Sequence, residues 1–145
     1  MNKQTTYATK LKDIKSQWFV IDATDKPLGR VASKAAKLLM GKENILITSN
    51  LDCGENVIII NSGKVNITGS KRTNKIYYKH TGFLGGIKSK TFEQLHAKSQ
   101  TKALEIAIKG MLPKNRMGRS MITKLHIYPM SEHKHSAQQP KLIEL

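Results

Sequence analysis

WFVIDATDKPLGRVASKAAKLLMG, residues 18–41, is the stretch that decides the fold. It opens with Trp18-Phe19-Val20-Ile21, an unbroken apolar run of strand-forming residues that predicts a buried strand. Asp25 and Pro27 are helix-start signals, with Asp25 as the candidate N-cap. The apolar residues that follow recur at helical spacing until Gly41, which is typical of a helix end. The stretch therefore predicts a buried strand followed by an amphipathic helix.

A second apolar run, Val57-Ile58-Ile59-Ile60, predicts another buried strand beyond that helix. Strand, helix and strand together favour a βαβ unit with parallel strands and a right-handed crossover. The alternating segments 65–68 and 125–128 predict a short third strand and a last strand. The predicted fold class is α/β, with a small, mainly parallel sheet of about four strands and helices on both faces.

Capping and termination signals predict further helices. Thr91 and Gln94 have the spacing of a capping box, which predicts a short helix after Thr91. Thr101 is the candidate cap of the next helix. Pro113 should end that helix, because the residue before a proline avoids helical geometry. A short helix is expected to follow Asn115.

Basic residues dominate the composition. The 145 residues suit one domain, and 25 Lys and Arg stand against 10 Asp and Glu, for a net charge of +15. Such an excess repels itself in a compact chain and predicts a polyanionic partner. Nucleic acid is favoured over an anionic membrane, because no basic amphipathic helix with bulky apolar anchors is apparent. No apolar run approaches the ~20 residues that span a bilayer.

Targeting signals and cysteine usage set expectations for location and domains. The N-terminus has no apolar signal region, and the lone Cys53 can form no intrachain disulfide and suits a reducing compartment. A soluble, cytoplasmic protein is expected. We expect residues 1–16 to be a polar arm and residues 17–145 to form a single α/β domain. That domain includes a basic segment, residues 69–90, which should contribute little to the core.

Charges are segregated along the chain. No Asp or Glu occurs between Glu55 and Glu93, or between Glu105 and Glu132. Counterion release scales with the number of phosphates neutralised, so acid-free stretches suit a polyanion-binding surface. Their cations are Lys64, Lys71, Arg72, Lys75, Lys79, Lys88 and Lys90 in the first interval, and Lys109, Lys114, Arg116, Arg119 and Lys124 in the second.

Aromatic residues and glycines are interleaved with the cations over residues 75–88. Tyr and His can stack on exposed bases or bond to 2′-hydroxyls, and glycines let backbones approach closely. The alternative is a flexible basic loop whose aromatics return to the core. Tyr77 and Tyr78 are adjacent, so on a strand they would point to opposite faces, and one of the pair is expected to be buried.

Signatures of catalysis and of small-ligand binding are missing. The turn DATDKPLGR, residues 22–30, lacks the three spaced glycines of a dinucleotide site and carries acids where a phosphate would bind. Gly63-Lys64 is followed by Val65, unlike a P-loop. His133 and His135 form a two-residue pair that is weak as a metal site. We therefore expect no enzyme activity, cofactor, metal or small-molecule substrate.

GMLPKNRMGR, residues 110–119, resembles the signature of the bacterial-type family of large-subunit ribosomal protein thirteen. Further blocks agree in the same order, so that the resemblance covers nearly the whole chain from Trp18 onward. They are Trp18 through Ala23, Leu28-Gly29-Arg30, Thr68-Gly69-x-Lys71, Tyr77-Tyr78-x-His80-Thr81-Gly82, Gly85-Gly86-Ile87-Lys88, His133-x-His135 and Ala137-Gln138-Gln139-Pro140. The resemblance implies a three-layer α/β/α core with basic extensions and no catalytic role.

The same resemblance implies a structural component of the large ribosomal subunit in the cytoplasm. It would bind 23S-type large-subunit rRNA directly, early in subunit assembly, beside neighbouring large-subunit ribosomal proteins. The alternative is a regulatory RNA-binding module that acts on mRNA off the ribosome. Residues 45–52 depart from the family pattern and are left out of the site. The candidate RNA-binding residues are Lys71, Arg72, Lys75, Tyr78, Lys79, His80, Thr81, Gly82, Gly85, Gly86, Lys88, Lys109, Lys114, Asn115, Arg116, Gly118, Arg119, His133 and His135.

Overall fold

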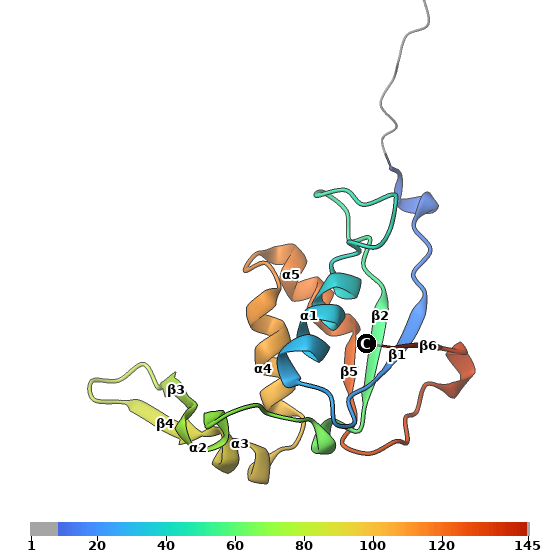
Figure 1. Ribbon diagram of the computed structural model, residues 1–145. Helices are drawn as coiled ribbons and strands as arrows, with labels where there is room; N and C mark the ends of the chain where they lie inside the picture. The colour runs from blue at the N-terminus through green and yellow to red at the C-terminus, as the bar shows by residue number, and fades with distance from the viewer. Residues whose placement is uncertain (1–8, 145) are drawn as a thin grey trace, which may run out of the picture.

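The structure, a computed structural model, describes residues 9–144 and combines a parallel sheet, a set of helices and a projecting hairpin (Figure 1). The sheet strands are β1 (Trp18–Asp22), β2 (Asn56–Ile60), β5 (Leu125–Ile127) and β6 (Lys141–Ile143). The helices are α1 (Leu28–Leu39), α2 (Lys71–Asn74), α3 (Phe92–Lys98), α4 (Lys102–Met111) and α5 (Arg116–Met121). The hairpin consists of β3 (Ile76–His80) and β4 (Ile87–Thr91).

All four strands of the sheet run parallel, in the order β5-β2-β1-β6. The predicted α/β class with a small parallel sheet is confirmed, and the arrangement is consistent with a three-layer α/β/α fold. The prediction of a strand at residues 65–68 was wrong, because this segment makes only an isolated bridge, between Asn66 and Pro27. The strand after β5 is β6, which the sequence did not predict.

The main core lies between the sheet and α1, with α4 packed against α1 (Figure 1). Ile21 of β1 and its neighbours Val57 and Ile59 of β2 are fully buried there. The apolar stripe of α1, represented by Val31 and Ala35, meets them. Burial of apolar area at about 25 cal/mol per Å² makes this strand–helix–strand unit the main source of stability.

The other face of the sheet is covered by the segment that leads from β5 to β6. Alternation along β1 turns Trp18 and Val20 to this face. The indole of Trp18 stacks on the His126 ring at a centroid distance of 5.5 Å and also meets the His135 ring at 5.0 Å. A cluster of aromatic rings therefore holds the C-terminal segment against the sheet.

The helix boundaries follow the predicted signals, with one correction. Asp25 is not the N-cap of α1: it lies in an exposed turn with a φ of 54°, and Pro27 occupies the cap position. Gly41 ends the helix with a φ of 69°. The capping box at Thr91 is confirmed, since its Oγ1 accepts from the Gln94 N–H while the Gln94 side chain accepts from the Thr91 N–H.

The predicted end of α4 and the helix after Asn115 are also confirmed. Leu112 is the C-cap of α4, directly before Pro113. Asn115 is the N-cap of α5, and its Oδ1 accepts a hydrogen bond of 2.8 Å from the Gly118 N–H. Thr101 occupies the N-cap position of α4 but makes no capping hydrogen bond through its side chain.

Candidate nucleic-acid interface

The hairpin β3–β4 projects from the body of the protein and lies within the first acid-free interval (Figure 1). Its two strands pair in antiparallel register from Ile76 opposite Thr91 to His80 opposite Ile87. The sequence placed this segment outside the core but did not predict a hairpin. The glycine-rich turn between two short β-forming runs was the signal that could have indicated one.

One face of the hairpin is cationic. In antiparallel pairing, opposite residues share a face, so Tyr77 and Lys79 lie with their partners Lys90 and Lys88. The three lysines are exposed. Lys79 and Lys88 face each other directly, and like charges in that position destabilise a strand pair. An anion bound between the two lysines would attract both ammonium groups and so offset their repulsion.

The other face of the hairpin carries exposed apolar and aromatic side chains beside the polar His80, Ser89 and Thr91. Tyr78 is 70% exposed and Ile87 66% exposed, and Ile76 lies beside them. Phe83 and Leu84 at the tip are also exposed. Contiguous exposed apolar side chains in a small protein indicate a binding surface.

Tyr77 and Tyr78 lie on opposite faces of β3, as the alternation of a strand requires. Tyr77 is half-buried, whereas Tyr78 points to solvent. Burial raises the pKa of the Tyr77 phenol above its usual 10.0. The Nζ of Lys75 lies 5.5 Å from the centroid of the Tyr77 ring. The expectation that one of the pair is buried is met by Tyr77, although only in part.

The tip of the hairpin is shaped by its glycines. Gly82 and Gly85 have φ values of 96° and 70°, a backbone region that residues other than glycine rarely adopt. A Cβ on Gly86 would overlap the Thr81 hydroxyl and lie 2.8 Å from the Phe83 carbonyl oxygen. The Thr81 N–H donates to the Gly86 carbonyl at 3.0 Å. These four candidate site residues thus have a structural role in the turn, and their contact with RNA stays a prediction.

The second cationic surface lies where α4 ends and α5 begins. Lys109, Lys114, Arg116 and Arg119 are all exposed, and no ion pair within residues 9–144 joins any of them to an acid. Three of these side chains, all except Arg116, line an open cavity of about 490 Å³. The structure therefore brings the predicted cations of this block together on one exposed surface.

Asn115 and Gly118 of the same block have structural roles. The Asn115 side chain is engaged as the cap of α5. Gly118 is buried, and a Cβ there would overlap the carbonyl oxygen of Pro113. The backbone N–H of Gly118 is already hydrogen-bonded to Asn115. Phosphate contact at this surface is therefore expected from the four cations Lys109, Lys114, Arg116 and Arg119.

Other cations of the protein are engaged internally. Lys124, in the second acid-free interval, forms a salt bridge of 2.9 Å with Asp52 and donates to the Gly54 carbonyl at 3.0 Å. Lys34 of α1 forms a salt bridge of 2.7 Å with Glu43. Engaged lysines are less available to phosphate, because each contact would have to replace an existing partner.

The two candidate histidines near the C-terminus lie in the aromatic cluster on the sheet. The His135 Nε2 is 3.0 Å from the Tyr128 hydroxyl, and its ring centroid is 4.4 Å from that of His126. The His133 Nδ1 accepts from the His135 N–H at 3.2 Å. The structure does not bring His133 and His135 together with the hairpin, so RNA contact by them stays a separate prediction.

This cluster predicts a pH-dependent stability. Burial lowers the pKa of His126 below its usual 6.5, and the nearby His135 lowers it further. The folded state then binds fewer protons than the unfolded state, so stability is fully present above pH 6.5 and declines as pH falls below it. Urea unfolding followed by fluorescence of Trp18, the one tryptophan of the chain, should show a lower midpoint at pH 5.5 than at 7.5.

A His126→Phe variant is the control for this prediction, since it keeps an aromatic ring without a titrating group. Its midpoint should change less between the two pH values than that of the wild type. An exposed histidine variant, His80→Gln, should retain the full pH dependence. Equal pH dependence in all three proteins would show that His126 is not the titrating group.

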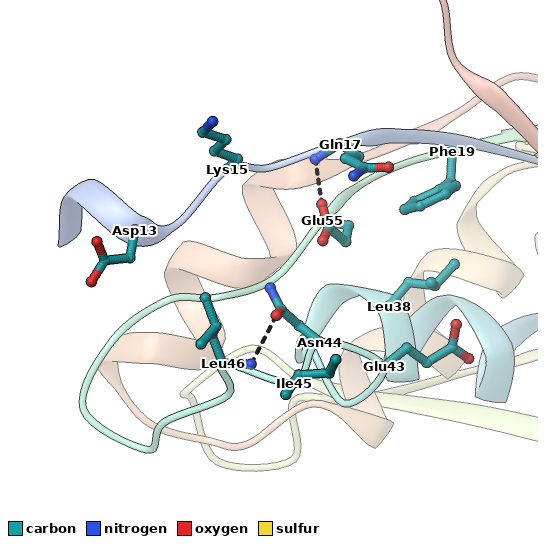
Figure 2. A pocket seen from close by; sticks show the side chains of 11 residues that line it. Asp13, Lys15, Gln17, Phe19, Leu38, Glu43, Asn44, Ile45, Leu46 and Glu55 are labelled. Carbon is teal, nitrogen blue, oxygen red and sulfur yellow. Dashed lines mark hydrogen bonds between the residues drawn. The ribbon is translucent and has the colours of Figure 1, made fainter. Parts of the chain in front are cut away.

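A cavity near the start of β1 has a different character. It has a volume of about 510 Å³, and Phe19 and Leu38 line it together with Glu43 and Glu55 (Figure 2). The Glu55 carboxylate accepts a hydrogen bond from the Gln17 N–H (Figure 2). Two glutamates make this cavity a poor phosphate site, so it is not part of the candidate interface.

The predicted polar arm, residues 1–16, lies only partly within the described residues. Residues 1–8 are outside them, and in the remainder of the arm the Thr9 hydroxyl donates to the Leu46 carbonyl at 3.1 Å.

Neither a metal-binding cluster nor a membrane-spanning helix is found in the described residues. Within residues 9–144, no group of three or more His, Cys, Asp and Glu residues could hold a metal ion. In the same part of the chain, no helix is long and apolar enough to cross a membrane.

Comparison with known proteins gives a consistent result. A model of the family described as ribosomal protein L13 matches residues 16–134. The large ribosomal subunit protein uL13 of Albidiferax ferrireducens is 51% identical over 140 residues, which cover 97% of this chain and 98% of the relative. The uL13 proteins of Levilactobacillus brevis and Listeria monocytogenes are 47% and 49% identical over 142 residues, covering 98% of this chain and 97% and 98% of theirs. The chain therefore belongs to the ribosomal protein L13 family.

Proposed function

We propose that this protein binds 23S-type rRNA of the large ribosomal subunit directly and supports early subunit assembly. The observation that carries the proposal is the pair of exposed cationic surfaces, the hairpin and the α4–α5 surface, whose lysines and arginines have no acidic partner within residues 9–144. Phosphate contacts neutralise such charges and release counterions. The proposed location is the large subunit in the cytoplasm, beside neighbouring ribosomal proteins.

Family membership supports the same direction. As a member of the ribosomal protein L13 family, the chain is a structural constituent of the ribosome and not an enzyme. The curated relatives carry the name large ribosomal subunit protein uL13. We further propose that residues 17–145 act as one domain, in which the sheet and α1 hold the hairpin and the α4–α5 surface in position for RNA.

Sedimentation tests the proposal against the alternative of an mRNA regulator. Tagged protein expressed in a bacterial host should co-migrate with the large subunit and remain there through high-salt washing, because many phosphate contacts and subunit neighbours hold it. A regulator that acts off the ribosome would remain near the top of the gradient with mRNA. The second result would overturn the ribosomal assignment.

The segment 70–90 is predicted to be mobile in the free protein and ordered on RNA. Both faces of the hairpin are largely exposed, so little burial offsets the entropy cost of ordering it. Amide hydrogens of β3 and β4 should exchange much faster than those of the buried strand β2 in RNA-free protein, and should slow when rRNA is added. Strong protection throughout the segment without RNA would contradict the prediction.

A further inference from the structure

An apolar groove lies between the start of α1, residues 66–68, the base of the hairpin and α4. Its volume of about 530 Å³ is in the range of small-ligand pockets, which span roughly 300–1,000 Å³. Leu28, Ile67, Tyr77 and Met111 are among the apolar and aromatic side chains of its lining. The first three are half-buried and the last is 43% exposed, so the groove opens to solvent.

The rim of the groove is cationic. Arg30, Lys71 and Lys75 line it, all three are exposed, and no acid is among the lining residues. No ion pair within residues 9–144 engages any of the three. The Nζ of Lys75 also lies 5.5 Å from the centroid of the Tyr77 ring, so a positive charge stands directly beside the aromatic part of the lining.

We propose that this groove takes a single unstacked nucleotide of the bound RNA, with the base against the apolar lining and the flanking phosphates on the cationic rim. The proposal rests on the proposed function and deepens it. RNA supplies both required chemistries in one ligand, since unpaired bases stack on aromatic side chains while the backbone meets Lys and Arg. A neutral apolar protein side chain would fill the groove but leave Arg30, Lys71 and Lys75 without a counter-charge.

Position in the fold supports the same occupant. Lys71 and Lys75 precede the hairpin and Tyr77 lies in its first strand, so the groove opens at the base of the cationic hairpin. An RNA strand that contacts the hairpin would therefore pass close to the groove. The sequence placed Lys71 and Lys75 among the candidate RNA-binding residues but did not predict the groove, because its lining comes from segments that are far apart along the chain.

A groove-filling variant tests the proposal. Gly29 lies in the first turn of α1 and lines the groove, and a Cβ there would meet no atom within 4 Å. Gly29→Leu should therefore keep the fold but occupy space that the base needs. Ser33→Leu is the matched control, since it adds the same side chain one turn later on the same helix, at an exposed position outside the groove.

Filter binding to purified large-subunit rRNA across a salt series gives the readout. Gly29→Leu should weaken binding by about tenfold to a hundredfold, as expected for loss of base stacking, with an unchanged salt slope. Arg30→Gln should instead reduce the salt slope by roughly 0.7–0.9. Ser33→Leu and Lys37→Gln, the second being an exposed position on α1 outside the groove, should bind like the wild type.

Chemical probing of RNA 2′-hydroxyls identifies the nucleotide. One unpaired nucleotide should be protected by the wild-type protein and by Ser33→Leu, and become reactive in complexes with Gly29→Leu. If the wild type binds rRNA and Gly29→Leu binds equally well with the same protections, the groove inference fails and the proposed function stands. If the wild type does not bind rRNA, the proposed function itself fails.

A protein occupant of the groove would give a different pattern. In that case Gly29→Leu would bind rRNA normally but no longer be retained in large subunits on sedimentation. That result would overturn the nucleotide assignment. Circular dichroism and urea unfolding of each variant would establish that every comparison is made between folded proteins.

Discussion

Reversal of Lys114, Arg116 and Arg119 to Glu in one variant is expected to weaken binding to large-subunit rRNA by about a hundredfold to a thousandfold near 0.1 M salt. All three cations are exposed on the α4–α5 surface, and none is engaged by an acid within residues 9–144. Each lost phosphate contact removes roughly 0.7 to 0.9 from the slope of log affinity against log salt. The slope of the triple variant should therefore fall by about 2 to 3.

The matched control is the same reversal at Arg30, Lys34 and Lys37 of α1. These three cations lie outside the buried apolar stripe of α1, and a smaller effect is expected because Lys34 is already paired with Glu43. Arg30 alone of the three lines the groove. Filter-binding titrations over a salt series would compare the two variants, with circular dichroism as a check on folding. Equal losses in two folded variants would mean that the charge acts diffusely.

The parts of the fold that the sequence predicted are those where burial imposes a period. β1, α1 and β2 pack on one another, so their apolar residues had to follow the spacings of strand and helix. The end of α4 was predictable for a local reason, because Pro113 constrains Leu112 directly. Both kinds of signal are present in the sequence before any tertiary contact is known.

The missed elements lack such a period. β6 has only three residues, and Leu142 at its centre is 67% exposed, so its apolar content is not distinctive. β3 and β4 are largely exposed on both faces, so burial does not explain why Tyr78 and Ile87 alternate with lysines. Segment 65–68 alternates like a strand but makes a single bridge to the turn before α1. Pairing partners, which the sequence does not display, decided these cases.

The candidate site also has a part that the sequence predicted and a part that depends on tertiary contacts. Acid-free intervals revealed the cations, because charge is a property of composition and needs no tertiary contact. The close backbone approaches at Gly86 and Gly118 emerged only from the folded geometry. The position of His135 in the cluster around Trp18 likewise depends on how the C-terminal segment crosses the sheet.

Substitution of Gly118 by Ala is expected to destabilise the protein by about 3 kcal/mol, at the upper end of the usual cost of overpacking. The added Cβ would overlap the carbonyl oxygen of Pro113 and lie 2.9 Å from its carbonyl carbon. Both atoms belong to the backbone, so no side chain can turn aside to relieve the contact. Displacement of α5 would also strain the hydrogen bond of 2.8 Å between the Gly118 N–H and the Asn115 cap.

Gly110→Ala is the matched substitution. Gly110 lies near the end of α4, and a Cβ there would meet nothing within 4 Å. Replacing a helical glycine with alanine at such a site should stabilise the protein by about 0.5–1 kcal/mol, because alanine loses less backbone freedom on folding. Urea unfolding should therefore shift the two midpoints in opposite directions from the wild type. A Gly118→Ala midpoint equal to that of the wild type would show that α5 does not pack against Pro113, and Arg116 and Arg119 would then be positioned differently for RNA.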